Sequence, residues 1–170
     1  MKKQIIILSI LSIAVLASAA FTIVNKSAPQ ANDLTGTWKA KVQFKTGPFA
    51  NVKNLEFMLS FNSGGTMTES SNYDGMPPVP PAYGIWRKTG SGQYEAKYEF
   101  YITNVPPSFE ALKKIGGFNP AGYGRLTEKI TLSPDGKTYK SKINFNVFDI
   151  TGKQMPNNDA AEVTASRMQF

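Results

Sequence analysis

The sequence predicts an all-β protein, an antiparallel up-and-down barrel of about eight strands with one short helix in a connection. Three observations favour this fold. Apolar and polar residues alternate with a period of two over most of the chain after residue 34. Turns rich in glycine, asparagine, aspartate and proline separate these segments. Consecutive strands joined by such turns avoid unpaired edges most simply by closing into a barrel.

The N-terminal segment has the pattern of an export signal, in which a basic start precedes an apolar stretch and then small residues. Two lysines come first, an almost wholly apolar stretch follows, and residues 17–20 read Ala-Ser-Ala-Ala. We expect a signal peptide over residues 1–20, cleaved near Ala19 or Ala20, and therefore a secreted or periplasmic location. The alternative is an uncut membrane anchor, because apolar character continues through residues 21–24 and roughly twenty such residues span a bilayer.

A flexible linker is expected over residues 21–33, followed by a single barrel domain over residues 34–170. The first three strands are expected at residues 38–45, 55–61 and 66–71. In the first of them, tryptophan, alanine, valine and phenylalanine alternate with lysine and glutamine, so one face is apolar. An Asn-Ser-Gly-Gly turn joins the second and third into a hairpin.

Alternation continues in the second half of the chain, where the turns again contain the residues that tight turns need. A Gly-Ser-Gly turn and a Pro-Asp-Gly turn each join two alternating segments. The remaining strands are expected at residues 83–89, 93–103, 124–133, 137–148 and 160–169.

Two connections are too long to be simple turns. Residues 72–82 contain four prolines, which fix φ and predict a stiff loop at the rim of the barrel. Residues 104–123 contain a short helix, with Ser108 as N-cap and Gly116 as C-terminal stop. Apolar residues spaced along one side of this helix predict that it covers one mouth of the barrel.

Gly36-Thr37-Trp38 at the start of the first strand, together with Arg167 on the last, resembles the calycin pattern of lipocalins. The chain is most similar in this respect to small secreted lipocalin-like proteins of bacteria. The resemblance implies that Trp38 closes one barrel end and that Arg167 packs across its ring, a cation–π contact. It implies a barrel with a pocket, and no reaction.

Six residues are the expected ligand-binding set. Aromatic side chains near the two long connections supply stacking surface, and others line the presumed interior. Glu128 alternates with leucine and isoleucine on an inward row, where a carboxylate must be paired or have a raised pKa. The alternatives are an ion pair with Arg167 or a bulge that turns Glu128 toward water. The set is Tyr83, Trp86, Tyr98, Phe100, Tyr123 and Glu128.

Composition excludes several chemistries. The chain has no histidine and no cysteine, which excludes Ser-His-Asp and Cys-His catalysis, and we expect no metal and no cofactor. Its net charge is +7, which falls to +5 once the two leader lysines are removed. The basic residues are scattered, so we expect no nucleic-acid partner and only weak affinity for anionic envelope surfaces. The sequence leaves the oligomeric state open.

These observations favour an exported, non-enzymatic binding or accessory protein that carries a small hydrophobic ligand in the barrel. Two alternatives remain open at this point. One is a small outer-membrane barrel, because alternation alone does not say whether the apolar face meets the interior or lipid. The other is a barrel enzyme of the cyclase or isomerase type, with Glu128 as its proton-transfer group.

Overall fold

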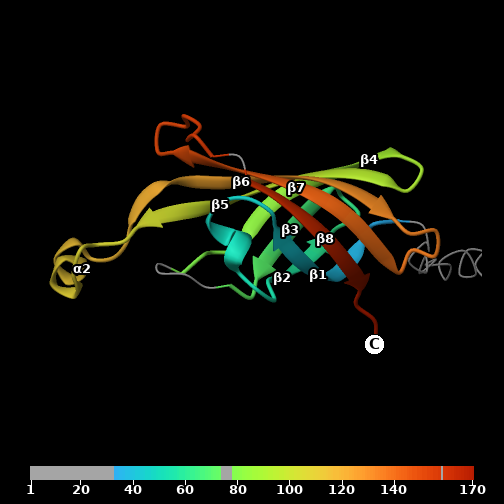
Figure 1. Cartoon of the computed structure of the whole chain (residues 1–170), viewed down its shortest axis with the longest axis horizontal. Coiled ribbons are helices and arrows are strands. Elements are labelled where there is room, and N and C mark those ends of the chain that lie inside the picture. The colour runs from blue at the N-terminus through green and yellow to red at the C-terminus, as the bar shows by residue number, and fades with distance from the viewer. Residues whose placement is uncertain (1–32, 74–77, 158) are drawn as a thin grey trace, which may run out of the picture. The chain divides into compact units, whose positions relative to one another are not determined.

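The computed structural model describes residues 33–73, 78–157 and 159–170, and these form a closed antiparallel barrel of eight strands. The predicted fold class is confirmed. Each strand pairs with the next one in the chain, and β8 pairs with β1 to complete the barrel (Figure 1). The strands are β1 (Gly36–Phe44), β2 (Glu56–Phe61), β3 (Thr66–Ser71), β4 (Ala82–Gly90), β5 (Gln93–Asn104), β6 (Asn119–Leu132), β7 (Thr138–Asp149) and β8 (Asp159–Arg167).

The apolar rows of the strands face the barrel interior. Trp38, Ala40, Val42 and Phe44 of β1 are all buried, whereas the lysines between them are exposed. Buried side chains from every strand form one continuous core. Removing this apolar surface from water stabilises the barrel, because each buried large side chain contributes about 1.5–3 kcal/mol.

The predicted signal peptide over residues 1–20 lies outside the described residues, as does the linker over residues 21–33 apart from Asp33.

The hairpin of β5 and β6 extends further than the sequence predicts. β6 begins at Asn119, whereas alternation predicts its start at residue 124. The missed segment contains Pro120 and Gly122, residues that usually mark loops. Gly122 has φ 136°, and a Cβ there would collide with the carbonyl oxygen of Phe148 on β7. Glycine thus allows the strand to continue past an irregularity in the pairing of β5 with β6.

The helix α2 (Phe109–Ile115) forms where the sequence predicts it, but its predicted contact is wrong. The Ser108 side chain accepts a hydrogen bond from the backbone N–H of Ala111, and Gly116 ends the helix with φ 76°. No residue of α2 is buried, and Phe109 is 68% exposed. The helix lies beyond the ends of β5 and β6, away from the barrel mouth (Figure 1). Among the described residues, no helix has the length and apolar character that crossing a membrane requires.

A second short helix, η1 (Pro48–Asn51), follows β1 and is absent from the sequence prediction. It is a single 3₁₀ turn, and its Phe49 packs against the core. Such a turn is too short to show a helical period, which explains why the sequence does not reveal it.

Candidate functional site

One end of the barrel is closed by Trp38. Its ring is fully buried, and its indole N–H donates to the carbonyl oxygen of Leu34 at 2.9 Å. The guanidinium of Arg167 lies 4.3 Å from the ring centroid, as the resemblance to lipocalins implies. Arg167 also donates to the backbone carbonyls of Asp33, Thr35 and Gly136. These bonds join the chain entering the barrel to the last strand and to the turn before β7.

The opposite end of β1 borders a cavity of about 90 Å³. This volume is large enough for several water molecules or for part of a small organic ligand. The lining is mostly aromatic and aliphatic, and it includes one carboxyl group. The lining residues are Phe44, Phe49, Leu55, Phe57, Glu69, Ser71, Tyr73, Val79, Pro80, Phe100, Leu126 and Phe145.

The aromatic walls of the cavity come from strands far apart in the sequence. The rings of Phe100 on β5 and Phe145 on β7 are stacked, with centroids 6.0 Å apart and planes at 12°. Phe145 also meets Phe44 of β1 edge to face, with centroids 6.3 Å apart. These contacts between rings stabilise the wall.

Phe49 of η1 and the proline-rich segment form the rim. The Phe49 ring contacts Phe145 at 5.9 Å and Tyr73 at 5.7 Å between centroids. Val79 and Pro80 line the cavity from the other connection. An open hollow of about 610 Å³ adjoins the cavity at the rim, and the two share the lining residues Phe49, Tyr73, Val79, Phe100 and Phe145. The site is therefore a narrow inner cavity with a wider apolar entrance.

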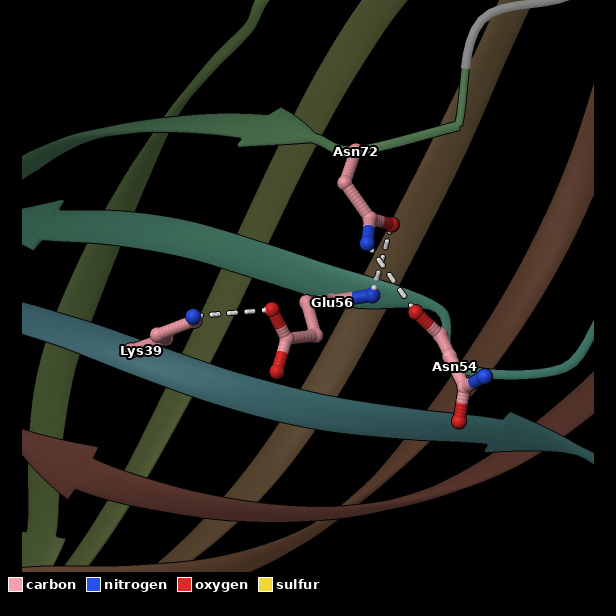
Figure 2. Close-up of polar contacts among 4 residues, drawn as sticks. All are labelled: Lys39, Asn54, Glu56 and Asn72. Atoms are coloured by element: carbon pink, nitrogen blue, oxygen red, sulfur yellow. Dashed lines mark hydrogen bonds and ion pairs between the residues drawn. The ribbon is translucent and has the colours of Figure 1, made fainter.

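Polar contacts on the outer surface hold the strands that carry this wall (Figure 2). The side-chain oxygen of Asn72 accepts from the Glu56 backbone N–H at 2.9 Å, and its amide nitrogen donates to the Asn54 carbonyl at 3.0 Å. Lys39 of β1 forms an ion pair with Glu56 at 3.0 Å. These contacts fix the start of β2 against the end of β3, next to the cavity-lining Phe57.

Glu69 is the carboxyl group of the cavity. It lies on the inward row of β3, it is only 7% exposed, and its Oε1 has no hydrogen-bond partner in the part of the chain that the structure describes. Burial, and secondarily the negative charge of Glu128, raise the pKa of Glu69 to about 8. No lysine or arginine is among the described residues that line the cavity. A proton, a water molecule or a ligand in the cavity can therefore satisfy this carboxyl group.

Glu128 lies deeper in the core, one inward position along β6 from the cavity-lining Leu126. It is 1% exposed, and its carboxylate accepts hydrogen bonds from the Tyr98 hydroxyl at 3.1 Å and from the Ser141 hydroxyl. Burial raises its pKa to about 7, and the two hydrogen bonds oppose that rise. Both alternatives for Glu128 are wrong, because it faces the interior and Arg167 binds backbone carbonyls instead.

The structure separates the six residues that the sequence grouped as one site. Of these, Phe100 alone lines the cavity. Tyr98 and Glu128 are bonded to each other inside the core. Trp86 packs against Phe61 and Tyr94, and its indole N–H donates to the Asn62 carbonyl.

The other two predicted residues face outward. Tyr83 is 67% exposed on the outer face of β4. Tyr123 stacks on Phe148 with centroids 4.8 Å apart, and Arg125 lies over the Phe148 ring at 4.5 Å. Nearness to a long connection does not fix which face of a strand a side chain occupies, and this is why the grouping fails.

Comparison of the chain with protein-family models and with curated proteins found no match.

Proposed function

We propose that this protein is an exported, non-enzymatic binding protein of the lipocalin-like type, which holds a small apolar ligand at the open end of its barrel. The observation that carries the proposal is the aromatic cavity behind Phe49, together with the wider apolar hollow that adjoins it at the rim. Concave apolar sites with one or two polar groups are the usual form of small-molecule sites. The contact of Arg167 with Trp38 supports the lipocalin-like assignment.

The arrangement of side chains favours this function over the two alternatives. A membrane barrel turns apolar residues toward lipid, whereas here the apolar rows face the interior and Lys39 and Lys41 face outward. An enzyme that uses Glu128 needs substrate at that carboxylate, yet Glu128 is occupied by two hydrogen bonds and does not line the cavity.

A titration with 2-naphthol, followed by amide NMR spectra, tests binding at the proposed site. We expect saturable shifts of the backbone amides of Ser71, Phe100 and Phe145, which surround the cavity. The indole N–H signals of Trp38 and Trp86 should stay in place, because both are bonded to backbone carbonyls away from the cavity.

A matched pair of variants on β3 separates filling of the cavity from a general effect on the strand. Ser71→Phe places a large ring in the cavity and should weaken 2-naphthol binding about tenfold or more. Ser70→Phe adds the same ring on the outer face, beside the exposed Met58, and should leave binding unchanged. Absence of saturable shifts in the natural protein, or equal binding by both variants, contradicts the proposal.

A further inference from the structure

We propose that the ligand is an apolar amine whose ammonium group binds the Glu69 carboxylate at the floor of the cavity. Its apolar body then lies among the phenylalanine rings and extends toward the entrance. This inference rests on the proposed function and names the chemical class of the ligand.

The position of Glu69 is the first argument. Its side chain is buried, it lines the cavity, and its Oε1 has no partner among the described residues. Buried polar atoms in folded proteins are almost always hydrogen-bonded, so an open buried acceptor facing a cavity indicates where a donor from a ligand fits. An ammonium group supplies three donors and no acceptor, which matches a carboxylate.

Charge is the second argument. Glu69 and Glu128 are two buried carboxyl groups whose negative charges disfavour each other. No cationic side chain is among the described cavity-lining residues, and Arg167 is engaged at the other end of β1. A cationic ligand stabilises the ionised form of Glu69 beside Glu128, whereas a carboxylate ligand adds a third acidic group to the same interior.

The aromatic walls are the third argument. The faces of aromatic rings carry negative potential and attract cations, most strongly where water is excluded. Phe57, Phe100 and Phe145 surround the space in front of Glu69 and also provide apolar contact for a hydrocarbon chain. The entrance beyond Val79 gives such a chain room to extend.

Binding of an ammonium group should release a proton from Glu69. Burial and the charge of Glu128 raise the pKa of Glu69 to about 8, so the free protein holds this carboxyl protonated at neutral pH. The titratable groups that face it are Glu128 of β6, Tyr98 of β5 and Tyr73 at the rim. Since the ammonium requires a carboxylate, the proton passes to solvent, and apparent affinity rises about tenfold per pH unit up to about pH 8.

Calorimetric titration with three ligands of equal chain length tests the inference. Hexylamine, 1-hexanol and hexanoate carry a positive, a neutral and a negative head on the same body. We expect hexylamine to bind about tenfold or more tightly than 1-hexanol at pH 8, with the difference shrinking at pH 6. Hexanoate should bind most weakly. These measurements use the unaltered protein, so they do not depend on a variant folding.

Three glutamine variants assign the effect to one carboxyl group. Glu69→Gln should abolish both the preference for hexylamine and its pH dependence, while 1-hexanol affinity stays the same. Glu128→Gln should keep the preference and move the rise in affinity to lower pH, because the charge that raises the Glu69 pKa is removed. Glu162→Gln changes an outer-surface glutamate that pairs with Lys45 and should have no effect.

The outcomes distinguish this inference from the proposed function. Equal binding of hexylamine and 1-hexanol at pH 8, or tighter binding of hexanoate, overturns the amine assignment and leaves an apolar site in place. If none of the three ligands binds and 2-naphthol also fails to bind, the proposed function fails together with the inference.

Discussion

Gly36 lies against the Arg167 guanidinium at the closed end of the barrel, in a backbone conformation that side chains disfavour. Its φ is 128°, and a Cβ at this position would lie 2.8 Å from Nη1 of Arg167. The absence of a side chain thus lets Arg167 reach both the Trp38 ring and the backbone carbonyl of Thr35.

Gly36→Ala should lower the free energy of unfolding by about 1–3 kcal/mol, because it combines backbone strain with displacement of Arg167. Gly64→Ala is the matched control: it lies in the turn between β2 and β3, and an added Cβ meets nothing within 4 Å. Urea unfolding followed by tryptophan fluorescence measures the free energy of unfolding of both variants. Equal stability of the two variants would show that the close approach of Arg167 contributes little.

The sequence reveals some of the individual site residues and hides others. Glu128 can be predicted to face inward because it alternates with apolar residues such as Ile130. Glu69 is missed because its inward row on β3 contains only one apolar residue, Met67, followed by Ser71, so β3 resembles a solvated strand. The only local signal is that Glu69 lies two positions from the buried Met67 and so faces the same side of the strand. One apolar residue is too weak a pattern to predict which side is buried.

Among the elements, α2 shows that local signals predict a helix but not its place. Ser108 and Gly116 mark its ends, since capping and the left-handed stop act within a few residues. The expectation that its apolar side covers the mouth assumes that apolar residues on a helix are always buried. In the structure, η1 and the segment with Val79 and Pro80 occupy the rim instead.

Replacing residues 105–118 with a short Asn-Gly turn should leave the barrel intact. Asn104 and Asn119 already pair across the hairpin, and no α2 residue is buried. We expect the midpoint of thermal unfolding to change by less than about 4 °C, since shortening a loop has a small entropic effect. Phe49→Ala, which removes a ring packed on the core, should lower the midpoint clearly. A comparable fall on removal of α2 would indicate an unrecognised contact with the barrel.

The whole molecule should lose stability as pH rises from acidic to mildly basic values. Burial raises the pKa of Glu128 to about 7 and that of Glu69 to about 8, both above the ordinary value of 4.5. The folded protein therefore keeps these protons to higher pH than the unfolded chain does. The resulting stabilisation is complete below about pH 4.5 and is lost as pH rises through about 7 and 8.

Urea unfolding at intervals between about pH 5 and pH 9 measures this loss. In the Glu69→Gln variant the free energy of unfolding should fall less steeply with pH, because an amide binds no proton in this range. Glu110→Gln alters an exposed glutamate on α2 and should reproduce the behaviour of the natural protein. Stability that stays constant or increases over this interval would mean that the two core carboxyls are ionised in the folded state at acidic pH.

Closure of the sheet could be predicted from the sequence, whereas the cavity could not. Eight alternating segments joined mostly by short turns have few arrangements in which the backbone hydrogen-bonding groups of every strand are paired on both sides. The free volume at the mouth depends on how Phe44, Phe49 and Phe145 pack together, and packing of this kind is a property of the assembled barrel.

The pairing of β1 with β8 has a consequence for biosynthesis. Trp38 lies opposite Arg167 and Phe44 lies opposite Ala161, so the first strand of the barrel gains its second partner only from the last strand of the barrel. A growing polypeptide carries the hydrogen-bonding groups of β1 open along one side until β8 has also been made. Contacts so distant along the chain form slowly, and the nascent protein depends on being kept from self-association during that interval.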